Sequence, residues 1–397
     1  MMFSTRVPSD LAENRFARTL ARARGAGSPI LDLTVSNPTR VGLDYPADLL
    51  QPLADPGALR YDPHPFGLPD ARAAVAAEFA RRGVEVAPDR VALTASTSEA
   101  YSLLFKLLCA PGDRVLIPQP SYPLFEHLTR LDGVEADPYH LEYHGVWTID
   151  VDGLARAIQP RTRAVLIVSP NNPTGSFLKP DELERIAALS ADRSLALISD
   201  EVFADYPMDP DARPAMTALA VASSGQGRRQ PLTFSLGGLS KSAGLPQVKL
   251  GWLAVGGPDA LVREALARLE LVCDTYLSVA TPVERAAAAL IAGGRAIRAQ
   301  IAARVGANYA RLADMVGQFP ACALLPCEGG WSAVVRVPAT RSEEQLVVTL
   351  LEQDHVLVYP GYFFDFPHEA FVVVSLLAEP SAFATAARRV LERATRD

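Results

Sequence analysis

The pattern that most constrains the fold begins at Asp70, where short apolar segments start to alternate with amphipathic segments of helical period. The apolar segments cover residues 114–117, 134–138, 164–168, 195–199, 232–236 and 253–255. The amphipathic segments between them include residues 98–109, 122–131, 151–157 and 179–190. Apolar strands separated by helices are typical of a mostly parallel sheet that is covered on both faces. The sequence therefore predicts an α/β protein.

After about residue 260 this alternation gives way to a long segment rich in alanine and arginine, including residues 284–311, which predicts a long helix. The last part of the chain returns to mixed strand and helix. We therefore expect a large domain at residues 46–290, a small C-terminal α+β domain at residues 291–397, and an N-terminal segment, residues 1–45, that contributes to the small domain. In that segment, residues 30–35 predict a short strand, and Asp10 with Glu13 has the spacing of a capping box that opens a surface helix.

Charge and composition narrow the choice of partners. The formal net charge of -7 is spread without long runs of like charge, so the chain has no basic stripe for nucleic acid and no polybasic anchor for a membrane. No apolar run approaches the roughly 20 residues that a membrane helix needs. The four cysteines do not have the spacing of a disulfide framework or of a zinc site; they are Cys109, Cys273, Cys322 and Cys327. We therefore expect a cytoplasmic protein whose partners are small molecules or copies of itself.

Polar residues follow three of the predicted strands at the point where each strand ends. Residues 169–175 read SPNNPTG, residues 199–203 read SDEVF, and residues 237–241 read GGLSK. Upstream, residues 94–99 (TASTSE) lead into a helix whose first amides are free to bind a phosphate. Each motif alone is usually only a turn or a helix cap. Because ligands of parallel sheets sit outside the carboxyl ends of the strands, their order and spacing together predict one site.

In this order, the motifs SPNNPTG, SDEVF and GLSKSAGLPQVKLGW resemble those of the aspartate aminotransferase-like superfamily, the fold-type-I pyridoxal phosphate enzymes, and the resemblance covers nearly the whole chain. It implies a large domain with a mostly parallel, seven-stranded sheet covered by helices, plus a smaller α+β domain. It also implies pyridoxal 5'-phosphate held as a Schiff base on Lys241, which moves the proton at the substrate α-carbon. Asp200 is implied to keep the pyridine nitrogen protonated, and Asn172 to bond the ring hydroxyl.

The resemblance extends to other cofactor contacts. Tyr122 matches the aromatic residue that stacks on the ring. The residues that match the phosphate site are Thr97, Ser98, Ser240 and Lys249. Tyr61, in YDPHPFGLPDAR, matches an aromatic residue that reaches the phosphate of the partner subunit, which implies a homodimer with shared active sites.

Three departures from the family pattern bear on the site. Lys249 stands where the family usually has an arginine, which keeps the charge but loses the bidentate fork. Phe203 replaces a tyrosine that often bonds the ring hydroxyl. Val373 replaces the arginine that typically grips the substrate carboxylate. Either the substrate is not an ordinary α-amino acid, or its carboxylate is held by other residues, for which the candidates are Ser36, Asn37, Arg40 and Arg336.

The sequence thus predicts an aminotransferase that moves an amino group between a small amino compound, such as an amino acid, and an oxo acid. Two alternatives stay open. A decarboxylase or lyase of the same fold would differ only in the bond that stands perpendicular to the ring, and a non-catalytic cofactor-binding module would share the fold without the reaction. No metal is needed for the proposed chemistry, and His140, Glu142 and His144 do not have the pattern of a metal site.

Overall fold

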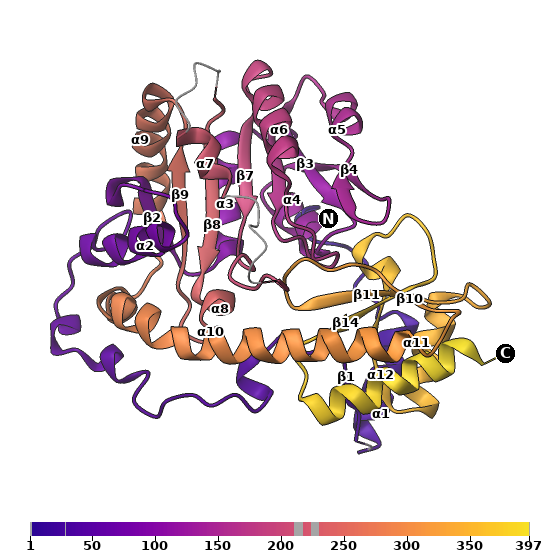
Figure 1. Cartoon of the computed structure of the whole chain (residues 1–397). Helices are drawn as coiled ribbons and strands as arrows, with labels where there is room; N and C mark the ends of the chain where they lie inside the picture. Colours follow the sequence, from indigo (N-terminus) through magenta and orange to yellow (C-terminus); the bar gives the residue numbers. More distant parts are fainter. Residues whose placement is uncertain (1, 28, 210–216, 224–229, 397) are drawn as a thin grey trace.

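The computed structural model describes residues 2–27, 29–209, 217–223 and 230–396 (Figure 1). An eight-stranded sheet with the order β2-β9-β8-β7-β6-β3-β4-β5 forms its centre. The five strands from β8 to β4 pair in parallel, whereas β2–β9, β9–β8 and β4–β5 pair antiparallel. The strands are β2 (Val91–Thr94), β3 (Arg114–Gln119), β4 (Glu135–Tyr143), β5 (Trp147–Ile149), β6 (Thr162–Val168), β7 (Ala196–Asp200), β8 (Thr233–Gly238) and β9 (Gly251–Gly256).

The predicted α/β class and largely parallel sheet are confirmed, but the sheet has one strand more than the seven expected. The extra strand is β5, which pairs only with the far end of β4, at residues 141–143. A strand of three residues, Trp147-Thr148-Ile149, is too short for its alternation to stand out as a period, so the sequence pattern missed it. The pattern also left out β2, which lies at the other edge of the sheet.

Helices cover both faces of this sheet because its strands are apolar on both sides. Val115 and Leu166 point into a core that includes residues of α3, α4 and α9, whereas their neighbours Leu116 and Ile167 point into a core that includes residues of α5 and α6. The helices of the large domain are α2 (Pro69–Arg81), α3 (Thr97–Leu108), α4 (Leu124–Leu131), α5 (Val151–Ala157), α6 (Pro180–Asp192), α7 (Ala218–Ser223), α8 (Leu239–Ser242) and α9 (Asp259–Tyr276). Each predicted helix of this region is present.

The long predicted helix is α10 (Thr281–Val316), which passes beneath the large sheet and continues under the smaller one (Figure 1). The smaller sheet has the order β10-β11-β14-β13, and β1 pairs separately with β12. The remaining elements are α1 (Arg15–Gly25), β1 (Leu31–Asp32), η1 (Pro38–Arg40), η2 (Gln51–Ala54), η3 (Pro56–Leu59), η4 (Pro88–Arg90), β10 (Ala323–Leu324), β11 (Ser332–Arg336), α11 (Glu343–Gln353), β12 (Val356–Leu357), β13 (Tyr359–Pro360), η5 (Gly361–Phe364), β14 (Phe371–Ser375) and α12 (Pro380–Thr395). The domain limits at residues 45 and 290 stay predictions.

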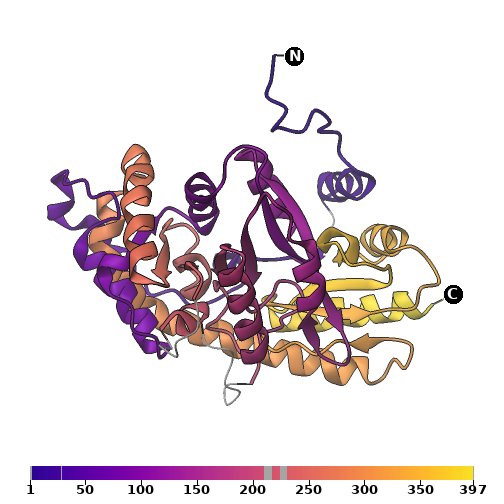
Figure 2. The ribbon, with the colours of Figure 1, turned by 90° about the horizontal axis from the view of Figure 1, so that it is seen from above.

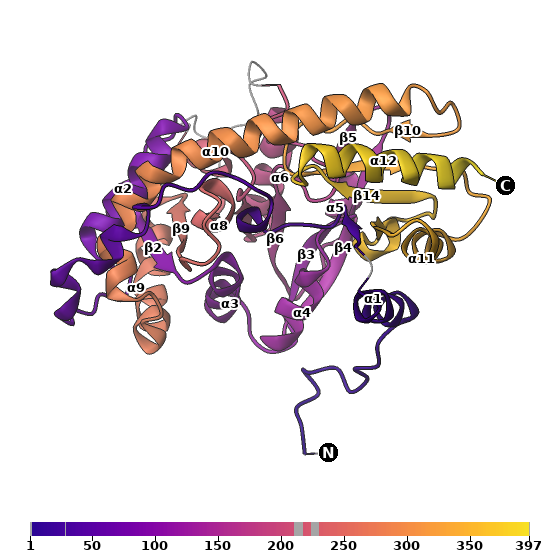
Figure 3. The same cartoon turned by 90° about the horizontal axis from the view of Figure 1, so that it is seen from below.

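The N-terminal helix α1 lies beside α11, and the extended chain before it is hydrogen-bonded to the end of α4 through Thr5 and Arg6 (Figures 2 and 3). The capping box predicted at Asp10 and Glu13 is wrong. The helix begins at Arg15, and its cap is Asn14, whose side-chain oxygen accepts from the amide of Ala17. Asp10 instead closes a turn with the amide of Ala12 at 2.8 Å. Asparagine caps a helix as well as aspartate does, so local composition alone did not distinguish the two positions.

Among the helices that the structure describes, none is long and apolar enough to cross a membrane.

Candidate active site

Lys241 lies in the single turn of α8, directly after β8, and its side chain is partly buried. Its amino nitrogen Nζ lies 5.1 Å from the ring centre of Trp331 and 5.7 Å from that of Phe203. Burial lowers the pKa of Lys241, while the charge of Asp200 acts in the opposite direction. The amine is therefore shifted toward its neutral, nucleophilic form.

Asp200 ends β7 and is only 8% exposed. The hydroxyl of Tyr101 donates to its Oδ2 at 2.8 Å, and the amide of Val202 donates to its Oδ1 at 3.1 Å. Burial raises the pKa of Asp200 to about 6, and these two hydrogen bonds work against that rise. A buried carboxylate of this kind fits a partner that carries a proton, such as a pyridinium nitrogen.

Asn172 stands in the turn after β6, and its Oδ1 accepts from the hydroxyl of Ser332 on β11 at 3.3 Å. The turn depends on Gly175, which has a φ of +71°. A Cβ atom at Gly175 would come within 2.2 Å of Cys327 Sγ and 2.7 Å of the carbonyl oxygen of Gly329. The glycine of the NPTG motif is therefore needed both for its conformation and for the close approach of the loop before β11.

The expected phosphate residues come together through strand register. Gly251 of β9 pairs with Thr94 of β2 on one side and with Gly238 of β8 on the other. Thr97 and Ser98 begin the helix that follows β2, Ser240 lies in the helix that follows β8, and Lys249 comes two residues before Gly251. Three segments that are far apart in the sequence therefore meet at one edge of the sheet, where the first turn of α3 begins.

The first turn of α3 is capped by two hydrogen bonds. The N-cap residue is Ser96, whose Oγ accepts from the amide of Glu99 at 3.1 Å, and the carboxylate of Glu99 accepts from the amide of Ala95, the residue before the cap, at 2.6 Å. The two bonds fix the start of the helix.

Two aromatic residues are expected at the cofactor, and they differ in exposure and in their contacts within the chain. Tyr122 follows β3 and is 46% exposed, and the amide of its neighbour Ser121 donates to the carbonyl oxygen of Phe364 at 3.0 Å. This bond ties the tyrosine loop to η5 of the smaller domain. Tyr61 is 74% exposed, and its contact with a partner subunit stays a prediction.

The candidates for a substrate carboxylate fall at two ends of β14. Ser375 donates from its hydroxyl to the carbonyl oxygen of Val35 at 2.6 Å, which fixes Ser36 and Asn37 beside the end of β14 that pairs with Ser332. Arg40 follows in η1 and is exposed. Arg336 pairs with Phe371 at the opposite end of β14 and is also exposed, so the structure does not bring it together with Asn172.

Val373 occupies the middle of β14 and is only 2% exposed. It belongs to an apolar cluster with Val334, Phe364 and Phe366. A carboxylate would find no polar partner at this valine.

Sequence reasoning missed three residues that border the site: Tyr101, Trp331 and Ser332. Tyr101 lies in the second turn of α3, beyond the helix start that the motif marks. Trp331 and Ser332 follow the pair Gly329–Gly330 and belong to none of the three strand-end motifs. The one available signal was that glycine pair directly before an aromatic residue, since paired glycines mark a close backbone approach.

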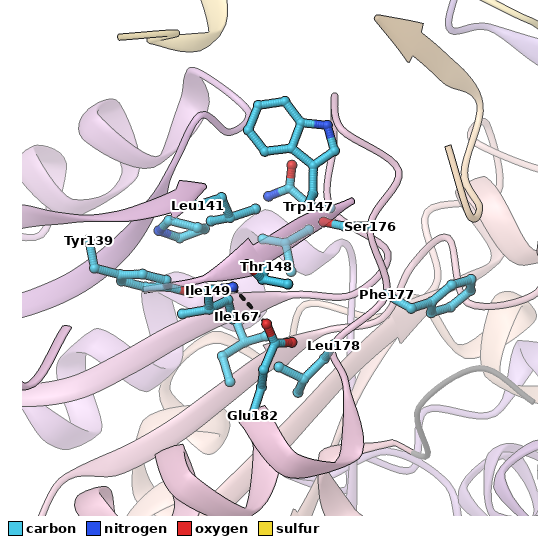
Figure 4. Close-up of a pocket in the computed structure, with 13 residues that line it drawn as sticks. Tyr139, Leu141, Trp147, Thr148, Ile149, Ile167, Ser176, Phe177, Leu178 and Glu182 are labelled. Carbon is cyan, nitrogen blue, oxygen red and sulfur yellow. Dashed lines mark hydrogen bonds between the residues drawn. The ribbon is translucent and has the colours of Figure 1, made fainter. Parts of the chain in front are cut away.

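A small cavity of about 10 Å³ lies beside the asparagine turn, and Lys241 is not among the residues that line it (Figure 4). It is bordered by side chains such as Tyr139, Trp147 and Glu182, and Glu182 accepts there from the amide of Ile149 at 2.7 Å. The space suits a single water and belongs to the core. In the part of the chain that the structure describes, no group of three or more His, Cys, Asp or Glu side chains is placed to hold a metal ion.

An amine, a buried carboxylate, an amide and a helix-start phosphate site at the carboxyl edge of this sheet define a fold-type-I pyridoxal phosphate enzyme. Comparison with known proteins gives the same class. The chain belongs to the aminotransferase class I and II family, whose model matches residues 36–383. Members of this family use pyridoxal phosphate. The predicted family, fold class, cofactor and aminotransferase activity are therefore confirmed.

The relatives found are similar over most of their length. Glutamate-pyruvate aminotransferase AlaA of Escherichia coli K12 is 26% identical over 355 residues, which are 87% of this chain and 85% of that protein. Alanine aminotransferase of Mycobacterium tuberculosis H37Rv is 27% identical over 366 residues, 87% of this chain and 81% of that protein. Among solved structures, alanine aminotransferase of Pyrococcus furiosus has a TM-score of 0.87 at 22% identity and covers 98% of both chains, which shows the shared fold.

Proposed function

We propose that this aminotransferase works through Lys241, with Asp200, Asn172 and Tyr122 holding the cofactor ring and Thr97, Ser98, Ser240 and Lys249 holding its phosphate. The observation that carries this proposal is the half-buried Lys241 amine, held against two aromatic rings and within the electrostatic reach of the Asp200 carboxylate. A partly buried lysine whose pKa is lowered and that interacts with a buried acid is poised to act as a nucleophile and as a base.

When bound, pyridoxal phosphate supplies an aldehyde that takes up amino groups and a ring that accepts the electron pair left at the α-carbon. Asp200 holds a proton at the pyridine nitrogen, which favours that electron flow. Lys241 Nζ takes the proton from the substrate α-carbon and returns it on the cofactor side. Phe203 gives the ring hydroxyl no partner, so Asn172 is the protein group left to bond it.

The substrates we propose are a small amino acid and an oxo acid, and the first pair to test is glutamate with pyruvate, after the name of the Escherichia coli relative. Because Val373 is buried among apolar side chains, it cannot bind the substrate carboxylate. We propose that the carboxylate is held by the segment after Val35 instead of by Arg336, because Ser375 anchors this segment at the end of β14 nearer Asn172. The residues of this segment are Ser36, Asn37 and Arg40. An Arg40→Ala change should therefore raise KM more than Arg336→Ala does.

We further propose a cytoplasmic homodimer in which Tyr61 of one subunit contacts the phosphate bound by its partner. The large exposed fraction of this aromatic side chain supports an additional contact. Mixed dimers test it. A Tyr61→Ala subunit combined with a Lys241→Ala subunit should give one active site that carries neither change and one that carries both, and activity should exceed that of either homodimer.

The deciding experiment follows amino transfer directly. The protein loaded with pyridoxal phosphate is supplied with a panel of amino donors and oxo acids, and both products are quantified. The expected result is that each new amino acid appears together with one oxo acid from the donor. Release of carbon dioxide, or of ammonia without an acceptor, would instead support the decarboxylase or lyase.

A further inference from the structure

Tyr101 provides a contact to Asp200 that no sequence motif indicated. Its hydroxyl donates to Asp200 Oδ2 at 2.8 Å, and both side chains are buried, with Tyr101 only 2% exposed. The other carboxylate oxygen, Oδ1, accepts from the amide of Val202. Each oxygen of Asp200 therefore has one donor from the protein, and each keeps a further lone pair for a ligand.

The tyrosine is fixed on the helix that also begins the phosphate site. Tyr101 comes four residues after Thr97, so both residues lie on one side of α3, one turn apart. Its ring stacks on Phe105 with 6.1 Å between ring centres and meets Phe125 edge-on at 5.5 Å. These contacts leave the hydroxyl little freedom to turn away from Asp200.

We propose that Tyr101 is a positioning residue that orients Asp200 and keeps it ionised for the pyridine nitrogen of the cofactor, and this inference rests on the proposed function. A hydroxyl can donate to both forms of a carboxyl group, but it bonds the ionised form more strongly. Burial raises the pKa of Tyr101 well above its ordinary value, and the negative charge of Asp200 adds to that rise, so the tyrosine stays protonated and keeps the hydrogen that it donates to Asp200. One helix thus supports both the phosphate end and the nitrogen end of the cofactor.

A second buried tyrosine provides a matched control. Tyr139 is as deeply buried as Tyr101, but its hydroxyl donates to the main-chain carbonyl oxygen of Leu166 at 2.9 Å. Tyr139→Phe removes the same atom from a similar environment without touching Asp200. An effect common to both variants is therefore structural, and an effect confined to Tyr101→Phe comes from the carboxylate.

The test measures affinity instead of activity. Apo forms of the wild type, Tyr101→Phe and Tyr139→Phe are titrated with pyridoxal phosphate and with its deaza analogue, in which a C–H group replaces the ring nitrogen. Tyr101→Phe should weaken binding of pyridoxal phosphate by about tenfold, the size expected for one hydrogen bond to a charged group, and leave binding of the analogue unchanged. Tyr139→Phe should change neither affinity. Equal weakening for both ligands, or no weakening for either, would overturn the proposal.

The same comparison is made in an Asp200→Asn background, where Tyr101→Phe should cost no further affinity, because the charge it supports is gone. If Tyr101→Phe weakened pyridoxal phosphate binding in the Asp200→Asn background as much as it does with Asp200 present, this result would independently contradict the proposal. Failure of the proposed function looks different: the wild type itself would then not attach pyridoxal phosphate to Lys241. Wild-type attachment with unaltered Tyr101→Phe affinity would reject only the role of Tyr101.

Discussion

The amino group of Lys241 lies 5.1 Å from the ring centre of Trp331, although the lysine follows a strand of the large sheet and the tryptophan directly precedes β11 of the small one. Phe203 completes the pair of rings, and its ring centre lies 5.3 Å from that of Trp331. Aromatic faces attract an ammonium group, whereas burial disfavours it, so the rings hold the lysine in place while its surroundings favour the neutral amine. The amine that we propose as the nucleophile is therefore positioned by both parts of the molecule.

Lys241→Ala should abolish covalent attachment of pyridoxal phosphate. The chain has only four lysines, Lys106, Lys179, Lys241 and Lys249, so attachment can be mapped by borohydride reduction and peptide mass analysis. We expect the adduct on the peptide that contains Lys241. Lys106→Ala is the control, because Lys106 pairs with Asp132 on the outside of α3 and should not affect attachment. An adduct on any other lysine would show that Lys241 is not the nucleophile.

Asp200→Asn should make the apo protein more stable at high pH. Burial raises the pKa of Asp200 to about 6, so the folded state holds this proton more tightly than the unfolded state. The protonated Asp200 side chain therefore contributes stability that is fully present below about pH 4, and this contribution is lost as the pH rises through about 6. Asparagine does not titrate, and we expect its advantage over aspartate to grow by about 1 kcal/mol or more between pH 5 and pH 8. Denaturant unfolding of both apo proteins at the two pH values measures this difference.

Asp113→Asn is the control of opposite sign. Hydrogen bonds from Arg163, followed by that from the amide of Ala110, lower the pKa of Asp113, so its ionised form stabilises the fold at neutral pH and this contribution is lost only at low pH. This variant should lose stability at pH 8. If both asparagine variants shift stability in the same direction at pH 8, the inference about Asp200 is wrong.

Gly175→Ala should destabilise the protein far more than Gly42→Ala. Both glycines have positive φ angles, +71° and +66°, so both changes cost the strain of a left-handed residue, about 1 kcal/mol. At Gly42 a new Cβ meets nothing within 4 Å, whereas at Gly175 it meets Cys327 Sγ and a main-chain oxygen. We expect a further 1–3 kcal/mol at Gly175, roughly the cost of overpacking. Thermal unfolding compares the two, and similar melting temperatures would contradict the tight approach.

Lys249→Ala should weaken binding of pyridoxal phosphate by roughly ten- to a hundredfold, because it removes a charged partner of the phosphate. Binding of pyridoxal, which has no phosphate, should not change. Lys249→Arg should restore the affinity, since the guanidinium group can bond two phosphate oxygens. Equilibrium titrations with both ligands check this, and an equal loss for pyridoxal would place Lys249 away from the phosphate.

Much of the fold could be predicted from the sequence because its signals are local. Helix α5 has the predicted bounds, and the strands β3, β4, β6, β7 and β8 follow the apolar segments. The predictions are wrong or incomplete where the local sequence signal is weak, or where two neighbouring residues give the same signal. Strand β5 is held by pairing with β4, and the cap of α1 moved from Asp10 to Asn14. Strand β1 is shorter than the predicted segment 30–35, because only Leu31 and Asp32 find partners on β12.

By itself the sequence determined which residues we propose to carry the chemistry: the lysine, aspartate and asparagine of the three strand-end motifs, and the first turn of α3. Their types and spacing follow the strand ends, which are properties of neighbouring residues. Only the tertiary structure decided what surrounds them, because contacts such as Tyr101 with Asp200 and Trp331 with Lys241 join segments that no sequence period relates. Side-chain packing between distant elements sets burial, and burial sets the acidity of both groups at the centre of the site.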